Sequence, residues 1–262
     1  MLIAVVRAVR LIIHLMVGLV IALAIHADRQ IAALRRKPEW IKPEDFAHWW
    51  ASVMLDVFNI QYRVRGEPMQ GARVTVANHV SWLDIPLIAA CEGTRFVSKS
   101  EVRDWPVAGM LAEAGGTFYI RRGKGGARPL LDKLKPHLQA QGSIVIFPEG
   151  TTTDGNQVKE FHPRLLAAAL EAGCPVQPIA LRYLPGPDGR NVAPFIGDDD
   201  LVSHIWRLLR QPELEAEIIY CAPIMPRGER DALALAAHKA VCTALALPQA
   251  AAVSSTAPAL AA

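Results

Sequence analysis

The chain of 262 residues has only four cysteines, and they form no recognisable pattern. Cys91, Cys174, Cys221 and Cys242 include no Cys-x-x-Cys pair, and none of the eight histidines stands at zinc-ligand spacing from them. This scarcity argues against a disulfide framework and against a structural metal site. The sequence therefore predicts reduced core cysteines in a cytosolic domain that binds no metal.

A strong charge of either sign is also missing, since the formal net charge is only +3. The small excess is unevenly placed: residues 1–44 hold seven Lys and Arg against three acids, which leaves the rest of the chain at −1. A basic segment of this kind suits an anionic membrane surface. It argues against a nucleic-acid partner, which would need basic residues spread along a groove of the fold.

Lys, Arg, Asp and Glu are all absent from the stretch Leu11–Ala27. As a helix this stretch measures roughly 26 Å, slightly less than the ~30 Å hydrocarbon core of a bilayer. Basic residues flank it on both sides, so the distribution of positive charge sets no clear orientation. We expect a helix that enters the cytoplasmic leaflet and returns. A single membrane span and a cleaved signal peptide are the alternatives.

A second helix is predicted over Pro43–Asn59, where apolar residues recur at helical spacing. The adjacent Trp49 and Trp50 suit a membrane interface, although a buried core face would show the same pattern. Joined through Asp28–Lys42, the two helices would form a membrane-associated helical hairpin over residues 1–59.

The remainder of the chain alternates strand-like and helix-like segments. Strands are predicted at Gln61–Arg65, Val74–Ala77, Thr117–Ile120, Ser143–Phe147, Val176–Tyr183 and Glu217–Tyr220, and helices include Pro86–Ala90, Pro129–Ala140 and Arg164–Ala172. Such alternation is typical of an α/β fold with a mostly parallel sheet flanked by helices. We place this domain at residues 60–247. The uncharged segment 248–262, rich in Ala, Ser and Pro, is predicted to be a disordered tail.

The stretch Asn78–Asp84 follows one of these apolar runs and places a histidine five residues before an aspartate. Histidine is the usual general base in proteins, because the free side chain has a pKa of about 6.5 and is mostly neutral in the cytosol, and His79 is the candidate here. A carboxylate on its far ring nitrogen would fix the tautomer, and Asp84 can reach that nitrogen if the chain turns between them. The alternative is structural, because Ser81 and Asp84 also resemble a capping box. Pro86 leaves open whether Asp84 lies inside or just outside the helix that follows.

A second polar turn is predicted at Phe147–Thr151, again directly after a strand. Pro148 cannot donate to a sheet ladder, and Gly150 permits backbone conformations that other residues avoid. Both turns would lie at the carboxyl edge of the sheet, where the sites of α/β proteins gather. The functional interpretation puts Glu149 and nearby backbone amides against a polar acceptor. An ordinary strand exit with an exposed Glu149 is the alternative.

These two turns are the first and third of four sequence blocks, and the other two are Gly116–Arg121 and Cys174–Ala180. The four blocks and their order resemble those of the lysophosphatidic acid acyltransferase (PlsC-like, 1-acylglycerol-3-phosphate O-acyltransferase) family, and the likeness extends from Ile60 to Tyr183. The resemblance implies that His79 is the general base and Asp84 its partner. It also implies a substrate-binding set of Asn78, Lys99, Arg121, Glu149, Gly150 and Thr151. A solvated loop position for Lys99 and a solvated basic run at Arg121 are the alternatives.

The chain departs from the family pattern at two points. Arginine usually follows Glu-Gly-Thr, but Thr152 and Thr153 follow here, so a cation that could hold a phosphate is missing. Where the family often has Phe-Lys-x-Gly, this chain has Phe161-His162-Pro163-Arg164, in which Pro163 is expected to begin a helix. Both departures concern the head group of the acceptor rather than the transfer of the acyl group.

The resemblance implies a membrane-bound O-acyltransferase on the cytoplasmic face of the inner membrane, where it would also contact membrane lipids. It would transfer a fatty acyl group from acyl-CoA or acyl carrier protein to the free hydroxyl of a lysolipid, without a cofactor. Lysophosphatidic acid is the expected acceptor, and lyso-ornithine lipid, which lacks a phosphate monoester, is the alternative. A non-catalytic membrane adaptor is the alternative of a different class, although it would have no need of His79, Asp84 and Glu149 together.

Overall fold

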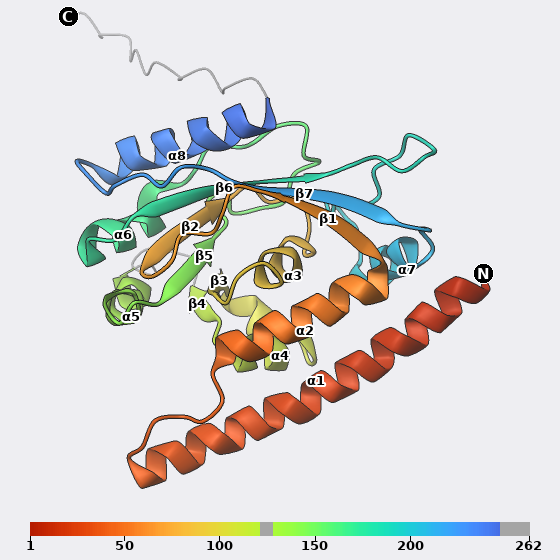
Figure 1. Ribbon diagram of the computed structural model, residues 1–262, viewed down its shortest axis with the longest axis horizontal. Helices are drawn as coiled ribbons and strands as arrows, with labels where there is room; N and C mark the ends of the chain where they lie inside the picture. The colour runs from red at the N-terminus through yellow and green to blue at the C-terminus, as the bar shows by residue number, and fades with distance from the viewer. Residues whose placement is uncertain (121–127, 247–262) are drawn as a thin grey trace, which may run out of the picture.

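The computed structural model describes residues 1–120 and 128–246, which are built around one twisted sheet (Figure 1). Its strands are β1 (Ile60–Arg65), β2 (Arg73–Ala77), β3 (Arg95–Lys99), β4 (Phe118–Ile120), β5 (Ser143–Ile146), β6 (Val176–Tyr183) and β7 (Leu214–Tyr220). Their order across the sheet is β1-β7-β6-β2-β5-β3-β4, and every neighbouring pair is parallel except β6 and β7. The predicted α/β fold with a mostly parallel sheet is confirmed.

Helices cover both faces of the sheet, as a parallel sheet requires. They are α1 (Leu2–Arg35), α2 (Pro43–Phe58), α3 (Asp84–Ala89), α4 (Ala108–Ala114), α5 (Arg128–Gln139), α6 (Ala167–Ala172), α7 (Leu201–Leu209) and α8 (Arg230–Leu245). On one face α5, α6 and α8 pack against Val74, Val76 and Ile144. On the other face α2, α3 and α7 pack against Ala77 and Val145.

The first helix is longer than the sequence predicts. The connection expected at Asp28–Lys42 is shorter, because α1 continues through a run of good helix formers and ends at Arg35. The Asp28 carboxylate, which is buried, accepts hydrogen bonds from the backbone N–H groups of Trp40 (2.8 Å) and Ile41 (3.0 Å). With 34 residues, α1 is about 51 Å long, and it is a single continuous helix that shows no return.

Helix α1 lies along the outer side of α2 (Figure 1). Its packing is close at Gly18, where an added Cβ would lie only 2.5 Å from Trp50 Nε1. The ring of His14 stacks on Trp50 with centroids 4.8 Å apart. These contacts bury one stripe of α1, while most of its other apolar side chains are exposed.

Three further details differ from the sequence-based expectation. Arg95–Lys99, where no strand is predicted from the sequence, forms strand β3, which lies between β5 and β4. Helix α3 begins at Asp84 rather than at Pro86. The helices α4 and α8 add to the predicted elements, whereas the helix expected from Pro163 is present as the 3-10 turn Pro163–Leu166 followed by α6. The predicted tail 248–262 lies outside the described residues.

Candidate active site

Four neighbouring parallel strands bring Lys99 and three of the four sequence blocks to one edge of the sheet, whereas the block Cys174–Ala180 begins at the opposite edge. The stretch with His79 follows β2, the turn with Glu149 follows β5, and Lys99 is the last residue of β3. Because β2, β5 and β3 are adjacent and parallel, their carboxyl ends lie side by side. Arg121 directly follows β4, the next strand across, but Arg121 itself lies outside the described residues.

The structure brings His79 and Asp84 together. His79 Nδ1 and Asp84 Oδ2 are 2.7 Å apart, and the carboxylate is fully buried whereas the imidazole is partly exposed. With Nδ1–H donated to the carboxylate, the lone pair of the neutral ring lies on Nε2. The ring of His79 also stacks on Phe147, with centroids 4.1 Å apart and an interplanar angle of 20°. The imidazole is therefore held in one orientation by both a hydrogen bond and a flat apolar contact.

The Asp84 carboxylate has both of the roles that the sequence left open. Its Oδ2 accepts from the backbone N–H of Val80 (2.7 Å) and of Ser81 (3.0 Å), which closes the turn at the start of α3. Its Oδ1 accepts from the hydroxyl of Tyr183 at 2.8 Å. Burial and the nearby Asp84 raise the pKa of Tyr183 well above its ordinary value, so Tyr183 donates as a neutral phenol.

Glu149 is buried and turned toward the protein, not toward open solvent. Its Oε1 accepts from the backbone N–H of His79 at 2.7 Å, and its Oε2 accepts from the backbone N–H of Lys159 at 2.8 Å. Burial raises the pKa of Glu149 to about 7, and the two amide hydrogen bonds oppose that shift. The carboxylate thus connects the turn after β5 to the backbone of His79, and the alternative of an exposed strand exit does not hold.

Thr152 and Thr153, at the point where the chain departs from the family pattern, also form hydrogen bonds within the protein. The backbone N–H of Thr153 donates to the carbonyl of His79 at 2.8 Å, so the peptide groups on both sides of His79 are held by this one turn. The Thr152 hydroxyl donates to the carbonyl of Phe195, in the connection between β6 and α7. Neither side chain supplies a cation at this position.

Asn78 is likewise engaged by the protein. Its side-chain amide donates to the carbonyl of Leu181 at 2.9 Å, and its side-chain oxygen accepts from the N–H of Leu181 at 2.7 Å. Since Asn78 is only 1% exposed, this geometry suits a residue that ties the start of the His79 turn to β6. A direct contact between Asn78 and a substrate would require these bonds to break.

The remaining candidates are at the surface of the same edge. Gly150 has a φ of +69°, a conformation that favours glycine, and the side chain of His162 lies against it. Gly150 and Thr151 are exposed, and Lys99 is partly exposed at the end of β3. Arg182, in contrast, donates to the carbonyl of Leu245 at 2.6 Å and lies near Glu217, on the side of α8.

Two residues of this site were not predicted from the sequence. Tyr183 donates to Asp84 across 99 positions of the chain, and Phe147 supports the imidazole. Both are the last residues of predicted strands, and this position at the carboxyl edge of the sheet is the sequence feature that could have indicated a place in the site. As a whole, the arrangement is a buried carboxylate, an oriented imidazole and an exposed Nε2 edge, which is the geometry of a general base that acts on a hydroxyl.

Comparisons with known proteins identify this chain as an acyltransferase. A family model described as Acyltransferase matches residues 59–182. A lyso-ornithine lipid O-acyltransferase of Pseudomonas aeruginosa is 47% identical over 200 residues, which cover 75% of this chain and 77% of that protein. One of Brucella abortus is 32% identical over 240 residues, covering 86% and 89%. A 1-acyl-sn-glycerol-3-phosphate acyltransferase of Neisseria gonorrhoeae is 32% identical over 146 residues, covering 55% and 57%.

Among solved structures, the 1-acyl-sn-glycerophosphate acyltransferase PlsC of Thermotoga maritima has the same fold. The TM-score is 0.55 at 19% identity, over 78% of this chain and 77% of the other. The chain belongs to the lysophosphatidic acid acyltransferase family, as its sequence blocks predict, and it is an enzyme that acylates lysolipids. Its apolar first helix and its family indicate that it associates with membranes.

Proposed function

We propose that this enzyme is a lyso-ornithine lipid O-acyltransferase that uses a thioester donor, acyl-CoA or acyl carrier protein. His79 Nε2 takes the proton of the lysolipid hydroxyl while the hydroxyl oxygen attacks the thioester carbonyl carbon. The tetrahedral intermediate then collapses, the C–S bond breaks, and the leaving thiolate takes the proton from the imidazolium. Asp84 orients the ring and stabilises its charge during this cycle, supported by the Tyr183 hydroxyl.

The observation that carries the acceptor assignment is Thr152. A phosphate monoester has close to two negative charges, and paired arginines bind such groups best. The family usually has an arginine at this position, whereas the Thr152 hydroxyl is bonded to the Phe195 carbonyl. Arg182, a cation near the end of β6, donates to the carbonyl of Leu245 and is therefore directed toward α8. The names of the P. aeruginosa and B. abortus relatives support the same acceptor.

The test is a competition between lyso-ornithine lipid and lysophosphatidic acid for one acyl donor, with the products separated by mass. We expect the wild type to prefer lyso-ornithine lipid and Thr152→Arg to shift the ratio toward lysophosphatidic acid. Gln157→Arg, which adds the same charge at an exposed position of the same loop, is the control and should leave the ratio unchanged. A wild-type preference for lysophosphatidic acid that Thr152→Arg does not alter would contradict the assignment.

The proposed location is the cytoplasmic face of the membrane, because acyl-CoA and acyl carrier protein are cytosolic donors. By length and composition α1 could cross a bilayer. Its packing supports a helix that lies in the interface plane instead. Arg7, near the N-terminal end of α1, donates to the carbonyls of Gln211 and Pro212, and Arg29, near the other end, donates to the carbonyls of Glu113 and Ala114. A helix held to the catalytic domain at both ends would have to detach in order to span.

A further inference from the structure

Exposed apolar side chains gather on two segments of the catalytic domain beside α1. Trp105, Val107 and Met110 belong to the segment that leads into α4 and to α4 itself, and each is at least 36% exposed. Val202 and Trp206, on α7, are 76% and 41% exposed. We call these five residues the apolar rim. Isolated exposed apolar residues are ordinary, but a group that includes two tryptophans marks an interaction surface.

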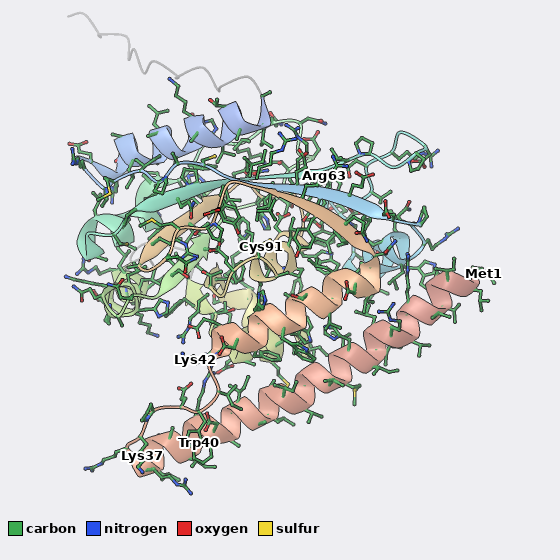
Figure 2. The ribbon with its side chains drawn as sticks, viewed as in Figure 1. Met1, Lys37, Trp40, Lys42, Arg63 and Cys91 are labelled. Atoms are coloured by element: carbon green, nitrogen blue, oxygen red, sulfur yellow. The ribbon has the colours of Figure 1, made fainter. Side chains whose placement is uncertain are left out.

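The two parts of the apolar rim flank opposite halves of α1. Helix α4 lies against the C-terminal half, where Arg29 donates to the carbonyl of Glu113 at 3.0 Å. Helix α7 and the turn after it lie beside the N-terminal half, where Arg7 donates to the carbonyl of Pro212 at 2.9 Å. Figure 2 shows the side chains along the outer side of α1 directed away from the domain between Met1 and Lys37, with Trp40 at the Lys37 end. The two helices that carry most of the rim, α4 and α7, therefore both contact α1, many of whose apolar side chains are exposed.

The sequence of α7 is that of an amphipathic helix in contact with an interface. His204, Leu208 and Leu209 are buried, whereas Val202 and Trp206, one turn apart, are on the exposed side. Arg210, directly after α7, and Arg10, on α1, are both exposed. Apolar and aromatic side chains beside basic ones are the combination that binds the headgroup region of an anionic bilayer.

The opposite side of the molecule differs. Helix α8 lies on the far face of the sheet from α1 (Figure 1). Within the described residues, the large apolar side chains that are exposed here are Leu235, on α8, and Met225, shortly before it. Neither α8 nor the segment that leads into it contains a tryptophan. The concentration of exposed tryptophans near α1 is thus a property of one side of the protein.

We propose that the apolar rim is a second membrane-contacting surface, which inserts into the same leaflet as α1. The partner is an anionic lipid bilayer, and the proposal does not depend on which lysolipid is the acceptor. Helix α7 is connected to the catalytic turn, because Trp82 Nε1 donates to His204 Nδ1 at 2.9 Å and Phe195 N–H donates to the Val80 carbonyl at 3.0 Å. Contact between α7 and the bilayer therefore places the His79 turn at the lipid surface, where its acceptor is found.

The first test measures the depth of single positions in the full-length protein. Val202→Cys, Val107→Cys and the control Leu235→Cys are labelled with a fluorophore that is sensitive to polarity. Burial raises the pKa of Cys91 to about 11 and raises that of Cys221, so the introduced exposed thiols should react first. On vesicles of phosphatidylglycerol and phosphatidylethanolamine, the labels at 202 and 107 should shift to the blue and be quenched by nitroxide lipids. The label at 235 should stay accessible to iodide. Iodide access at 202 and 107 equal to that at 235 would overturn the proposal.

The second test separates insertion from folding. The double variant Val202→Ser/Trp206→Ser is compared with Leu235→Ser/Met225→Ser. Burial of one such side chain is worth about a tenfold change in partitioning. The rim variant loses two, so its activity on acceptor embedded in vesicles should fall by about tenfold to a hundredfold. Its activity on acceptor dispersed in detergent should be unchanged, which shows that it folds, and the control pair should keep both activities. Wild-type activity of the rim variant on vesicles, or an equal loss in detergent, would contradict a role in membrane contact.

Discussion

The two polar turns at the carboxyl edge of the sheet differ in the direction of their side chains. In the turn after β2, the imidazole of His79 is partly exposed and presents its Nε2 edge. In the turn after β5, the carboxylate of Glu149 and the hydroxyls of Thr152 and Thr153 all bind backbone groups of the protein. The first turn carries the proposed general base, and the second turn holds the backbone of that residue in place.

The second turn shows how the backbone of His79 can be held in place although it belongs to neither a strand nor a helix. His79 lies between β2 and α3, where neither ladder nor helix fixes its backbone. Its N–H is bound by Glu149 and its carbonyl by the N–H of Thr153, so a neighbouring strand exit supplies the missing hydrogen bonds. Precise placement of a base matters because small displacements reduce turnover strongly.

The comparison between the two turns predicts that substitutions in the first turn reduce turnover most. His79→Ala should reduce turnover by roughly 10²–10⁴-fold, the usual contribution of a general base. Asp84→Asn should also be severely impaired, because it loses the carboxylate that orients the ring. Thiol release from the acyl donor with added lysolipid measures both. His26→Ala, a change to an exposed histidine of α1, is the control and should remain close to wild type. A well-folded His79→Ala with near-normal turnover would remove the proposed mechanism.

A change in the second turn should act on stability first and on turnover second. Glu149→Gln keeps one acceptor oxygen but faces one backbone N–H with an amide, which leaves a buried group unsatisfied. We expect a loss of about 1–3 kcal/mol in the free energy of unfolding. Turnover should fall less than in His79→Ala, because the imidazole and Asp84 remain. Urea unfolding followed by the thiol assay tests both parts, and a loss of turnover equal to that of His79→Ala would contradict a role that is mainly structural.

The same variant should change the pH dependence of stability. The pKa of Glu149 in the folded protein is about 7, above its ordinary value of 4.5. The folded state therefore binds this proton more tightly, so the contribution to stability is present below pH 4.5 and is lost as the pH rises to about 7. The difference in unfolding free energy between wild type and Glu149→Gln should shift by up to about 3 kcal/mol over that range. The exposed Glu160→Gln should preserve the wild-type slope.

The sequence predicted the contact between His79 and Asp84 better than the contacts that hold these two residues in place. A spacing of five residues is a local feature, and the turn between His79 and Asp84 could be inferred from it. The bond between Glu149 and the His79 backbone joins positions 70 residues apart, and that between Tyr183 and Asp84 joins positions 99 apart. Such pairs depend on strand order, which alternation of strands and helices does not specify. Glu149 was accordingly expected to face an acceptor, whereas its oxygens are bound by backbone amides.

Strand β3 illustrates a second reason why the elements predicted from the sequence differ from those in the structure. Its five residues include an arginine, a serine and a lysine, and only Phe96 is buried, so its pattern is that of a polar loop. Its conformation is set by pairing with β5 and β4, a tertiary effect that propensity does not contain. Helix α1 was misjudged at its end for a related reason, because the charged Asp28 there is satisfied by the backbone of Trp40 and Ile41 instead of ending the helix.

The smallest predicted effect concerns Thr152. It separates the contact of the second turn with Phe195 from the contacts of the same turn with the backbone of His79. Thr152→Val keeps the shape of the side chain but removes the hydroxyl that donates to Phe195. One hydrogen bond at a partly exposed position contributes about 0.5–1.5 kcal/mol, so the unfolding free energy should fall by that amount. Turnover with lyso-ornithine lipid should change little, because the Thr153 and Glu149 bonds to the His79 backbone are intact. Thr243→Val, at an exposed position of α8, is the control for the substitution itself. A loss of turnover on the scale of His79→Ala would contradict this expectation and would show that the contact with the connection between β6 and α7 is needed to position the base.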